Sequence, residues 1–339
     1  MHKNTFEVIN VCDLDKTGLD DSFLNGHYLQ SLKWCKSIDH SFYAVSYKNN
    51  VIVATSVISF KKLPLLLGSI CYINRGPVGE TESDIINHNS DLIKYLSKHN
   101  VVFVMCSPMV YTEKHVQKIS DALTSAGWKT EHQTLSLYKS TLVIDLSPDL
   151  EVIRSKFRRS LKTQLNKSEK LGIDINLDPE DSAIKDFFKY FNSMAEERGL
   201  SIIDSNMMKF IFDAKKRNEA KIVLAYVQGR LISGIILMKQ DDRIIYEWGM
   251  NTQEPEFKSL PLAHKMHWEA IKWAKNYGYS IYDFGGYWLD RGNNDPINYF
   301  KLGFTKNVQI VTPEFYYVLQ PLKYYLIKIL NNIRKALKS

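Results

Sequence analysis

Long hydrophobic runs are missing from this chain. No uninterrupted stretch of about 18 apolar residues occurs, so the sequence offers no candidate for a membrane-spanning helix. The first residues, Met1–Glu7, lack the apolar core of a signal peptide. We therefore expect a cytoplasmic protein.

Cysteine is scarce, and metal-binding spacings are missing. The four cysteines all lie in the first third of the chain, with no CxxC pair among them: Cys12, Cys35, Cys71 and Cys106. This spacing argues against a disulfide framework and favours free thiols in a reducing compartment. The nine histidines form no metal-spaced cluster either. We expect no bound metal.

Two common catalytic signatures are also absent. The chain has no Gly-x-Ser-x-Gly nucleophile elbow and no phosphate-binding loop. These absences argue against a serine hydrolase of the α/β class and against a P-loop nucleotide hydrolase. We expect no bound cofactor.

The chain has instead the composition of a globular protein with a substantial core. Hydrophobic residues make up 45% of the sequence, and no segment is of low complexity. The length of 339 residues favours two domains over one large domain. The formal net charge of +7 is unevenly distributed, which suggests an anionic ligand or surface.

One order of predicted elements occurs twice along the chain. In the first half we expect helices at 22–38, 82–99 and 112–126 and strands at 42–47, 51–60, 69–73, 101–105 and 135–144. In the second half we expect long helices between 148 and 217, a helix at 260–277, and strands at 221–227, 231–239, 243–250 and 280–284. The predicted fold class is α/β (α+β), with two similar domains that each hold a mixed, mainly antiparallel sheet flanked by helices.

The expected domains are residues 1–147 and 148–318, followed by a basic C-terminal helix at 319–339. We place the boundary here because Ser147 can cap a helix whose first position Pro148 occupies. After Glu314 the chain has no acidic residue, and five basic residues alternate with apolar ones at helical spacing. This tail either makes peripheral contact with an anionic membrane, binds RNA, or packs its apolar stripe on the protein body.

A basic amphipathic helix is predicted after this boundary. Apolar residues recur there every three or four positions, at Leu150, Ile153, Phe157, Leu161 and Leu165. The opposite face carries seven basic residues against two glutamates, and its central cations are Arg158, Arg159 and Lys162. This face is either only solvated or contacts the phosphates of tRNA or another anionic substrate.

Two segments late in the chain can carry chemistry. The predicted strand Tyr282–Phe284 continues into Gly285 and Gly286, and a glycine pair lets the backbone turn or approach a ligand closely. The following helix carries Lys301 between two phenylalanines. Its amine is either desolvated and held where negative charge develops, or it belongs to a surface lysine that covers aromatic rings.

A third candidate segment lies in the first half. Arg75 stands at a strand end beside the Gly76-Pro77 turn. An arginine held in this way can bind a phosphate or carboxylate through two parallel hydrogen bonds. It can equally donate to carbonyl groups of the turn.

Together these segments resemble the Fem family of nonribosomal peptidyl and aminoacyl transferases, which add amino acids from aminoacyl-tRNA to the stem peptide of peptidoglycan precursors. The matching segments span nearly the whole chain: Gln30-Ser31 with Trp34 and Lys36, Asn74-Arg75-Gly76-Pro77-Val78, Lys170-Leu171-Gly172-Ile173, Glu197-Arg198-Gly199, Tyr282-Asp283-Phe284-Gly285-Gly286 and Phe300-Lys301-Leu302-Gly303-Phe304.

The resemblance implies two tandem acetyltransferase-like (GNAT) domains, in agreement with the repeat read from the elements. It implies a catalytic Lys301 beside Phe300, and a peptidoglycan precursor, linked to lipid or UDP, as the acceptor. The donor would be aminoacyl-tRNA. It also implies that Lys36 and Arg198 bind the phosphate-sugar portion of the precursor. We expect Arg75, Tyr282 and Asp283 to line the same substrate cleft.

The chain also departs from the family pattern. The family often has an aspartate before a strand-end proline, whereas this chain has Ser107 before Pro108, so one precursor contact is expected to be absent or different. Two other functions stay open. One is an acyl-CoA-dependent N-acyltransferase that acts on an envelope sugar or peptide amine, against which the glycine-free connection 251–259 argues. The other is a noncatalytic module that binds RNA or membrane.

Overall fold

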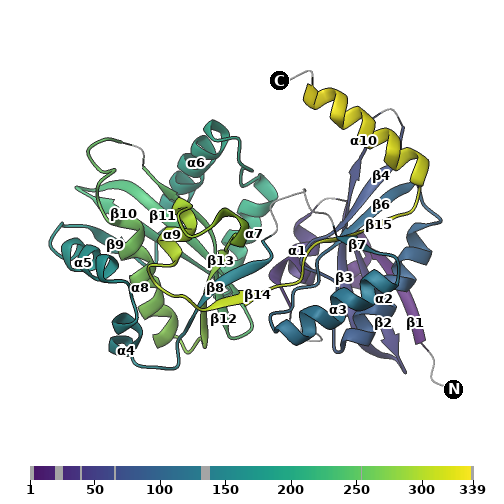
Figure 1. Cartoon of the computed structure of the whole chain (residues 1–339), viewed down its shortest axis with the longest axis horizontal. Helices are drawn as coiled ribbons and strands as arrows, with labels where there is room; N and C mark the ends of the chain where they lie inside the picture. Colours follow the sequence, from purple (N-terminus) through teal and green to yellow (C-terminus); the bar gives the residue numbers. More distant parts are fainter. Residues whose placement is uncertain are drawn as a thin grey trace. The chain divides into compact units, whose positions relative to one another are not determined.

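The computed structural model describes residues 4–19, 26–38, 40–64, 66–130, 138–252 and 254–336. These residues form two compact units (Figure 1). The first unit combines Met1–Leu137 with Ile310–Ser339, and the second is Tyr138–Gln309. No helix among the described residues is both long enough and apolar enough to cross a membrane.

The first unit is built on one mixed sheet with the strand order β1-β2-β3-β4-β6-β15-β7. Its strands are β1 (Asn4–Asn10), β2 (Phe42–Lys48), β3 (Val51–Lys62), β4 (Ser69–Ile73), β6 (Val101–Cys106), β7 (Lys129–Thr130) and β15 (Phe315–Val318), and β5 (Val78–Gly79) pairs with β3. The pair β4 and β6 is parallel along the whole of β4. The neighbouring pairs are antiparallel.

Helices cover both faces of this sheet. On one face, α2 (Glu82–Leu96) and α3 (Glu113–Ser125) pack against a core that includes Ile58, Ile73 and Phe315. On the other face lie α1 (Leu32–Ser37), which follows the turns η1 (Val11–Lys16) and η2 (Tyr28–Gln30), and α10 (Pro321–Ala336). The strands are apolar on both faces because both are covered.

The second unit repeats this arrangement, with the strand order β14-β8-β13-β12-β11-β10-β9. Its strands are β8 (Ser140–Asp145), β9 (Asp174–Asn176), β10 (Ala220–Val227), β11 (Arg230–Gln240), β12 (Arg243–Asn251), β13 (Ile281–Gly286) and β14 (Val308–Ile310). Its helices are α4 (Leu150–Ser155), α5 (Arg159–Ser168), α6 (Asp181–Glu197), α7 (Ser205–Lys216), α8 (Leu262–Asn276) and α9 (Pro296–Lys301), and the turn η3 (Leu289–Arg291) precedes α9.

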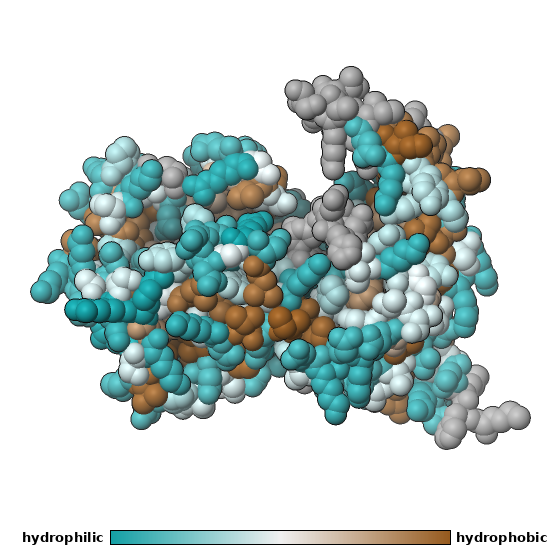
Figure 2. All heavy atoms as spheres, in the orientation of Figure 1, coloured by the Kyte–Doolittle hydropathy of each residue, from teal (hydrophilic) through white to brown (hydrophobic). Residues whose placement is uncertain are grey.

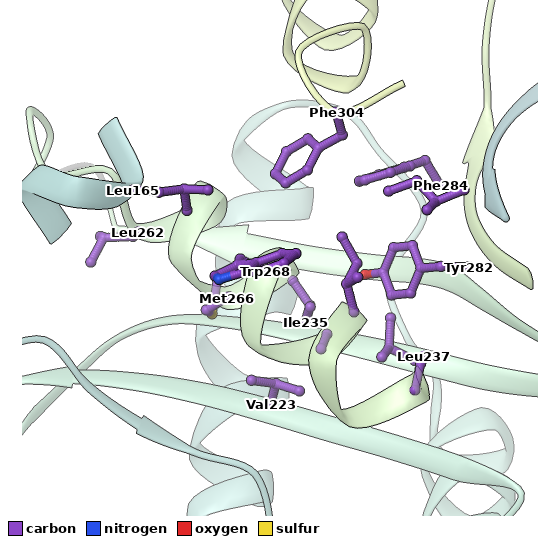
Figure 3. Close-up of a cluster of buried hydrophobic side chains, with 14 of the residues drawn as sticks. Leu165, Val223, Ile235, Leu237, Leu262, Met266, Trp268, Tyr282, Phe284 and Phe304 are labelled. Carbon is purple, nitrogen blue, oxygen red and sulfur yellow. The ribbon is translucent and has the colours of Figure 1, made fainter. Parts of the chain in front are cut away.

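The core of the second unit lies between its sheet and α8, which packs with α4 and α5 on one face (Figure 3). Successive strand residues point to opposite faces. Ile235 therefore enters this core, whereas a Cβ at Gly234 would lie 2.5 Å from the Phe187 ring of α6. The helices α6 and α7 thus cover the other face.

The predicted fold class is confirmed, because each unit is a mixed, mainly antiparallel sheet with helices on both faces. The hairpin turns between β2 and β3 and between β10 and β11 have the backbone conformation of tight turns. Asn49 and Asn50 both have positive φ, as do Gln228 and Gly229. Asparagine and glycine tolerate this conformation, and two such residues in a row form the tight turn that suits twisted strands.

The boundaries of the units differ from the expected domains 1–147 and 148–318. β8 precedes residue 147, yet it pairs with β13 of the second sheet. β15 lies before residue 319, yet it pairs with β6 of the first sheet. Strand pairing between residues distant in sequence decides both assignments, and local spacing does not contain this information. The helix expected at 319–339 forms as α10, over Pro321–Ala336.

Some local expectations were also wrong. The single basic helix is two helices, α4 and α5, and α4 begins at Leu150 after Asp149 instead of at Pro148. The helix expected at 22–38 begins at Leu32. Residues 22–25 of that helix, and 135–137 of the strand expected at 135–144, lie outside the described residues. Six strands were not expected, and all of them except β1 have four residues or fewer: β1, β5, β7, β9, β14 and β15.

Candidate functional site in the second unit

The two parallel strands of the second sheet pair over a short stretch and then part. β12 and β13 are paired at Arg243–Ile245 and Ile281–Asp283. β13 is paired with β8 on its other side as well, and that pairing shifts register beyond Asp283 and continues at Gly286 with Thr141 of β8. In the first unit the corresponding parallel pair stays together to the end of β4. The separation of β12 and β13 therefore distinguishes the second unit from the first. The carboxyl end of a strand in such a sheet is a frequent place for a functional site.

Lys301 lies at this place. It is the last residue of α9, and Asp295 caps the helix by accepting hydrogen bonds from the backbone N–H groups of Ile297 and Asn298. The Lys301 side chain is 5% exposed, and its Nζ donates to the carbonyl oxygen of Gly286 at 2.6 Å. A short, capped helix thus holds the amine against the end of β13.

Burial is the main influence on the charge of Lys301. Loss of solvent lowers the pKa of this amine to about 8, while the nearby carboxylates Asp283, Glu247 and Asp295 act in the opposite direction. The Nζ atom also lies 5.9 Å from the ring centroid of Tyr246. Near neutral pH the side chain is therefore a buried cation close to its point of deprotonation. This state distinguishes it from the surface lysine that the sequence also allowed.

The glycine pair makes room for this arrangement. Gly285 has a φ of +65°, and a Cβ there would lie 2.8 Å from the backbone oxygen of Tyr246. A Cβ at Gly286 would lie 2.8 Å from the Tyr138 ring. The backbone can therefore leave β12 and present the Gly286 carbonyl to Lys301 only if both positions are glycine.

Asp283 and Tyr282 are fully buried, which does not fit the expected direct contact with a substrate. Asp283 accepts hydrogen bonds from Arg243 at 2.6 Å, from the backbone of Gly285 at 2.7 Å and from the Thr141 hydroxyl. The Tyr282 hydroxyl is hydrogen-bonded to Nδ1 of His267 at 2.7 Å. The sequence showed that Tyr282 and Asp283 lie beside the glycine pair. It could not show that their polar atoms already form hydrogen bonds within the core.

Aromatic rings surround the remaining side of α9. Phe300 is half-buried, with its ring centroid 5.0 Å from that of His264 and 5.4 Å from that of His267. The ring centroid of Phe304 lies 5.0 Å from that of Phe284 (Figure 3). Burial lowers the pKa of His267 to about 3 and that of His264 to about 4, so both rings are neutral near pH 7.

His264, His267, Tyr246 and Arg243 were not predicted as part of this site. All four come from α8 and β12, whose helical or strand periodicity reads as ordinary core. The one available signal is the pair His264 and His267, three residues apart on one helix face.

The three basic residues expected to contact tRNA have different settings. Arg158 stands between α4 and α5, and its guanidinium lies 3.8 Å from the ring centroid of Tyr299 and donates to the Tyr299 carbonyl at 3.3 Å. Its backbone N–H donates to Gly303 at 2.9 Å. Lys162 donates to the Ser155 carbonyl at 3.1 Å, and Arg159 is exposed. Arg158 therefore clamps the helix that carries Lys301.

Arg75 and the segment around it belong to the first unit. Arg75 is buried and has a φ of +61°, which is unusual for a residue with a side chain. Its backbone N–H donates to the Ser107 hydroxyl at 2.9 Å, and the Ser107 N–H donates to Gly76 at 3.0 Å. Ser107, where the family resemblance leads us to expect an aspartate, thus holds the Arg75 turn.

Gln30 joins two of the matching segments in the first unit. Its side chain donates to the carbonyl of Asn74 at 2.6 Å and accepts from the backbone of Val57 at 2.8 Å. A Cβ at Gly76 would lie 2.3 Å from this side chain, which explains the glycine there. Lys36, at the end of α1, is half-exposed and ion-pairs with Asp15.

The structure thus gathers part of the predicted site. Phe300, Lys301, Asp283 and Arg158 meet around α9 and the end of β13. Arg198 is exposed at the end of α6, a helix on the other face of the sheet. Arg75 and Lys36 lie in the first unit and are described with it alone.

The fold defines the class of protein. Over 93% of this chain and 99% of the other, the structure is similar to a tandem GNAT protein from the clavulanic acid biosynthesis pathway, with a TM-score of 0.52 and 9% identity. It is similar to the crystal structure of FemX over 95% of this chain and 99% of that chain, with a TM-score of 0.75 and 18% identity. The chain therefore has the predicted tandem GNAT-like fold.

The sequence comparisons define the family within that class. The model of the FemAB family matches residues 20–233 and 229–332, and the chain belongs to this family. It is 22% identical over 325 residues to the UDP-N-acetylmuramoylpentapeptide-lysine N(6)-alanyltransferase of Weissella viridescens, which covers 86% of this chain and 91% of that protein. The family resemblance read from the sequence is confirmed.

Proposed function

We propose that this protein is an aminoacyltransferase that moves an amino acid from aminoacyl-tRNA to an amine on the stem peptide of a lipid- or UDP-linked peptidoglycan precursor. It would act in the cytoplasm, where charged tRNA is found. The observation that carries the proposal is the buried Lys301 amine, held on Gly286 where β12 and β13 part, in a member of the FemAB family. The alanyltransferase relative acts on a lysine of such a precursor, as its name states.

The proposed chemistry is aminolysis of an ester. The acceptor amine attacks the ester carbonyl of the donor, a C–N bond forms, the C–O bond to the tRNA ribose breaks, and the proton lost by the amine ends on the ribose oxygen. Negative charge develops on the carbonyl oxygen in between. The ammonium of Lys301 has three N–H donors and gives one to Gly286, so others are available for that oxygen.

The surroundings of Lys301 suit this role. The charge sits among aromatic rings, and electrostatic stabilisation is stronger in such an environment than in water. Arg158 and the Asp295 cap fix the helix, so the amine is positioned before the reaction begins. We assign Asp283 and Tyr282 to positioning the end of β13, in place of substrate contact.

Charge distribution favours tRNA over acyl-CoA as the donor. Acetyltransferases hold the CoA pyrophosphate between the central strand and the next helix. In the second unit this connection carries Glu254 and Glu256, both paired with Arg230. In the first unit the first turn of α2 carries Glu82 and Asp84. Neither connection therefore carries the net positive charge that would hold a pyrophosphate.

One experiment tests both the donor and Lys301. The purified protein is incubated with a UDP-linked or lipid-linked muropeptide and either charged tRNA or acyl-CoA, and the product is analysed by mass spectrometry. We expect an added amino-acid mass with charged tRNA. Lys301→Met should lower the transfer rate by about 100-fold or more, with precursor affinity within about two-fold, because the change removes an interaction made in the transition state.

Three results would contradict the proposal. An acyl mass added from acyl-CoA, and none from charged tRNA, would identify a CoA-dependent acyltransferase. Unchanged turnover of Lys301→Met would remove this lysine from the mechanism. Salt-sensitive binding of tRNA without any product would identify a noncatalytic module.

A further inference from the structure

The C-terminal helix α10 is fixed to the first unit by one face. The Tyr324 ring lies 5.3 Å from that of Phe103 and 5.9 Å from that of Tyr316, and Ile327 packs into the same cluster. At the start of the helix, Lys323 donates to the side chain of Asn100 at 2.8 Å. The orientation of α10 about its own axis is thereby set.

The opposite face of α10 is apolar and exposed to solvent. Leu322 is 88% exposed and Tyr325 is 66% exposed, and the stripe continues with Leu326, Ile329 and Leu330. With about 3.6 residues per turn, these spacings of three and four align the five side chains along one side of the helix. Figure 2 shows hydrophobic side chains gathered over α10. A contiguous exposed patch of this kind marks an interaction surface.

Lysines border this stripe. At about 100° per residue, Lys323 and Lys328 fall on the two flanks, between the packed face and the exposed face. The helix sequence continues with Arg334 and Lys335, and no acidic residue follows Glu314. An apolar centre with basic flanks is the pattern of a helix that lies in the plane of a membrane interface.

We propose that α10 binds the surface of an anionic lipid bilayer, with its apolar stripe in the acyl region and its flanking lysines at the lipid phosphates. RNA does not fit the centre of the stripe, which carries no charge. A second copy of the chain fits poorly, because two stripes in contact would bring the uncompensated lysines of both helices together. The bilayer alone offers an apolar layer beneath a layer of negative charge.

The test measures binding of the full-length protein to vesicles by flotation. The vesicles contain either equal parts of phosphatidylglycerol and phosphatidylcholine, or phosphatidylcholine alone. We expect binding to the anionic vesicles, weakened at least several-fold without phosphatidylglycerol or in 0.5 M salt. The double variant Leu326→Asp with Ile329→Asp should lose about ten-fold or more in affinity. Leu66→Asp, at a 94% exposed site on the loop between β3 and β4, should bind as the unchanged protein does.

The two substituted side chains face solvent, so the thermal unfolding midpoint of the double variant should stay unchanged and exclude misfolding as the cause of lost binding. Absence of binding to anionic vesicles, or binding that the double variant retains, would overturn the proposal. A concentration-dependent dimer that the double variant abolishes, without vesicle binding, would assign the stripe to a second copy instead. Vesicle binding requires no catalysis, so none of these results bears on the proposed transfer reaction.

Discussion

The charge of Lys301 gives the site a pH dependence of defined sign. Burial places the pKa of this amine at about 8, below its ordinary value of 10.5. The ammonium form, which stabilises the oxyanion in the proposed reaction, is therefore complete well below pH 8 and is lost as the pH rises through that value.

Deprotonation of the acceptor amine raises the rate of any variant alike, so we expect the single-turnover rate of the unchanged protein, divided by that of Lys301→Arg, to fall about ten-fold per pH unit above pH 8. The measurement is the rate between pH 6.5 and 9.5, with the stability of the donor ester followed in parallel. Lys301→Arg supplies the control, because a guanidinium does not titrate in this range. A ratio that stays constant up to pH 9.5 would show that the ammonium is not required.

Asp283 should act on stability as well as on the site. Asp283→Asn leaves the buried guanidinium of Arg243 without its counter-charge, and we expect the free energy of unfolding to fall by about 3 kcal/mol. Denaturation in urea measures the loss. Asp290→Asn, at an exposed position on η3, should change little. Equal stability of the two variants would mean that the ion pair adds nothing.

For individual residues, the sequence predicted which ones surround the site and only part of what each of them does. Lys301 and Gly285 were recognised from the family pattern of the segments that hold them. The burial of Asp283 depends on Arg243 and Thr141, which are 40 and 142 residues away along the chain. Local patterns do not reveal such partners, so the sequence predicts a substrate contact where the structure has a buried carboxylate.

Among the elements, the break between α4 and α5 has the clearest functional meaning. It places Arg158 outside helical geometry, where its guanidinium can cover Tyr299 and reach the end of α9. The apolar spacing Ile153, Phe157, Leu161 continues through the break without a change of period. The sequence therefore predicted one helix, and periodicity could not have shown two.

Arg158→Ala should weaken the hold on α9. We expect it to lower the free energy of unfolding by about 1–2 kcal/mol and the transfer rate by about ten-fold, because a misplaced Lys301 loses alignment. Arg159→Ala is the matched neighbour and should leave stability unchanged, since Arg159 is exposed. If both variants only weaken tRNA binding to the same extent, Arg158 is a tRNA contact and not a clamp.

Two strands lie on the other side of an expected domain boundary from the sheet in which they pair, β8 with the second sheet and β15 with the first. The repeat of elements was visible in the sequence, because hydrophobic periodicity is local. The pairing of β8 with β13 and of β15 with β6 was not visible in the sequence. The residues of a short strand do not indicate which distant strand it will pair with. The fold class was therefore predicted, and the division of the chain was not.

This division predicts which fragments fold. A fragment of residues 138–309 contains all of β8 to β13 and should unfold cooperatively in urea, whereas 148–318 lacks β8 and should not. The comparison uses two fragments of nearly equal length, so size does not explain a difference. Equal cooperativity of both would show that β8 is dispensable to the second sheet.

The position of β15 has a further consequence for folding during synthesis on the ribosome. The second unit is continuous in sequence, whereas the sheet of the first unit receives β15 only after the second unit has been translated. Until then β6 presents an open edge of unpaired backbone groups, the kind of edge that invites aggregation. The first part of the chain to be synthesised is thus the last to be completed, and it is the part we expect chaperones to shield during synthesis.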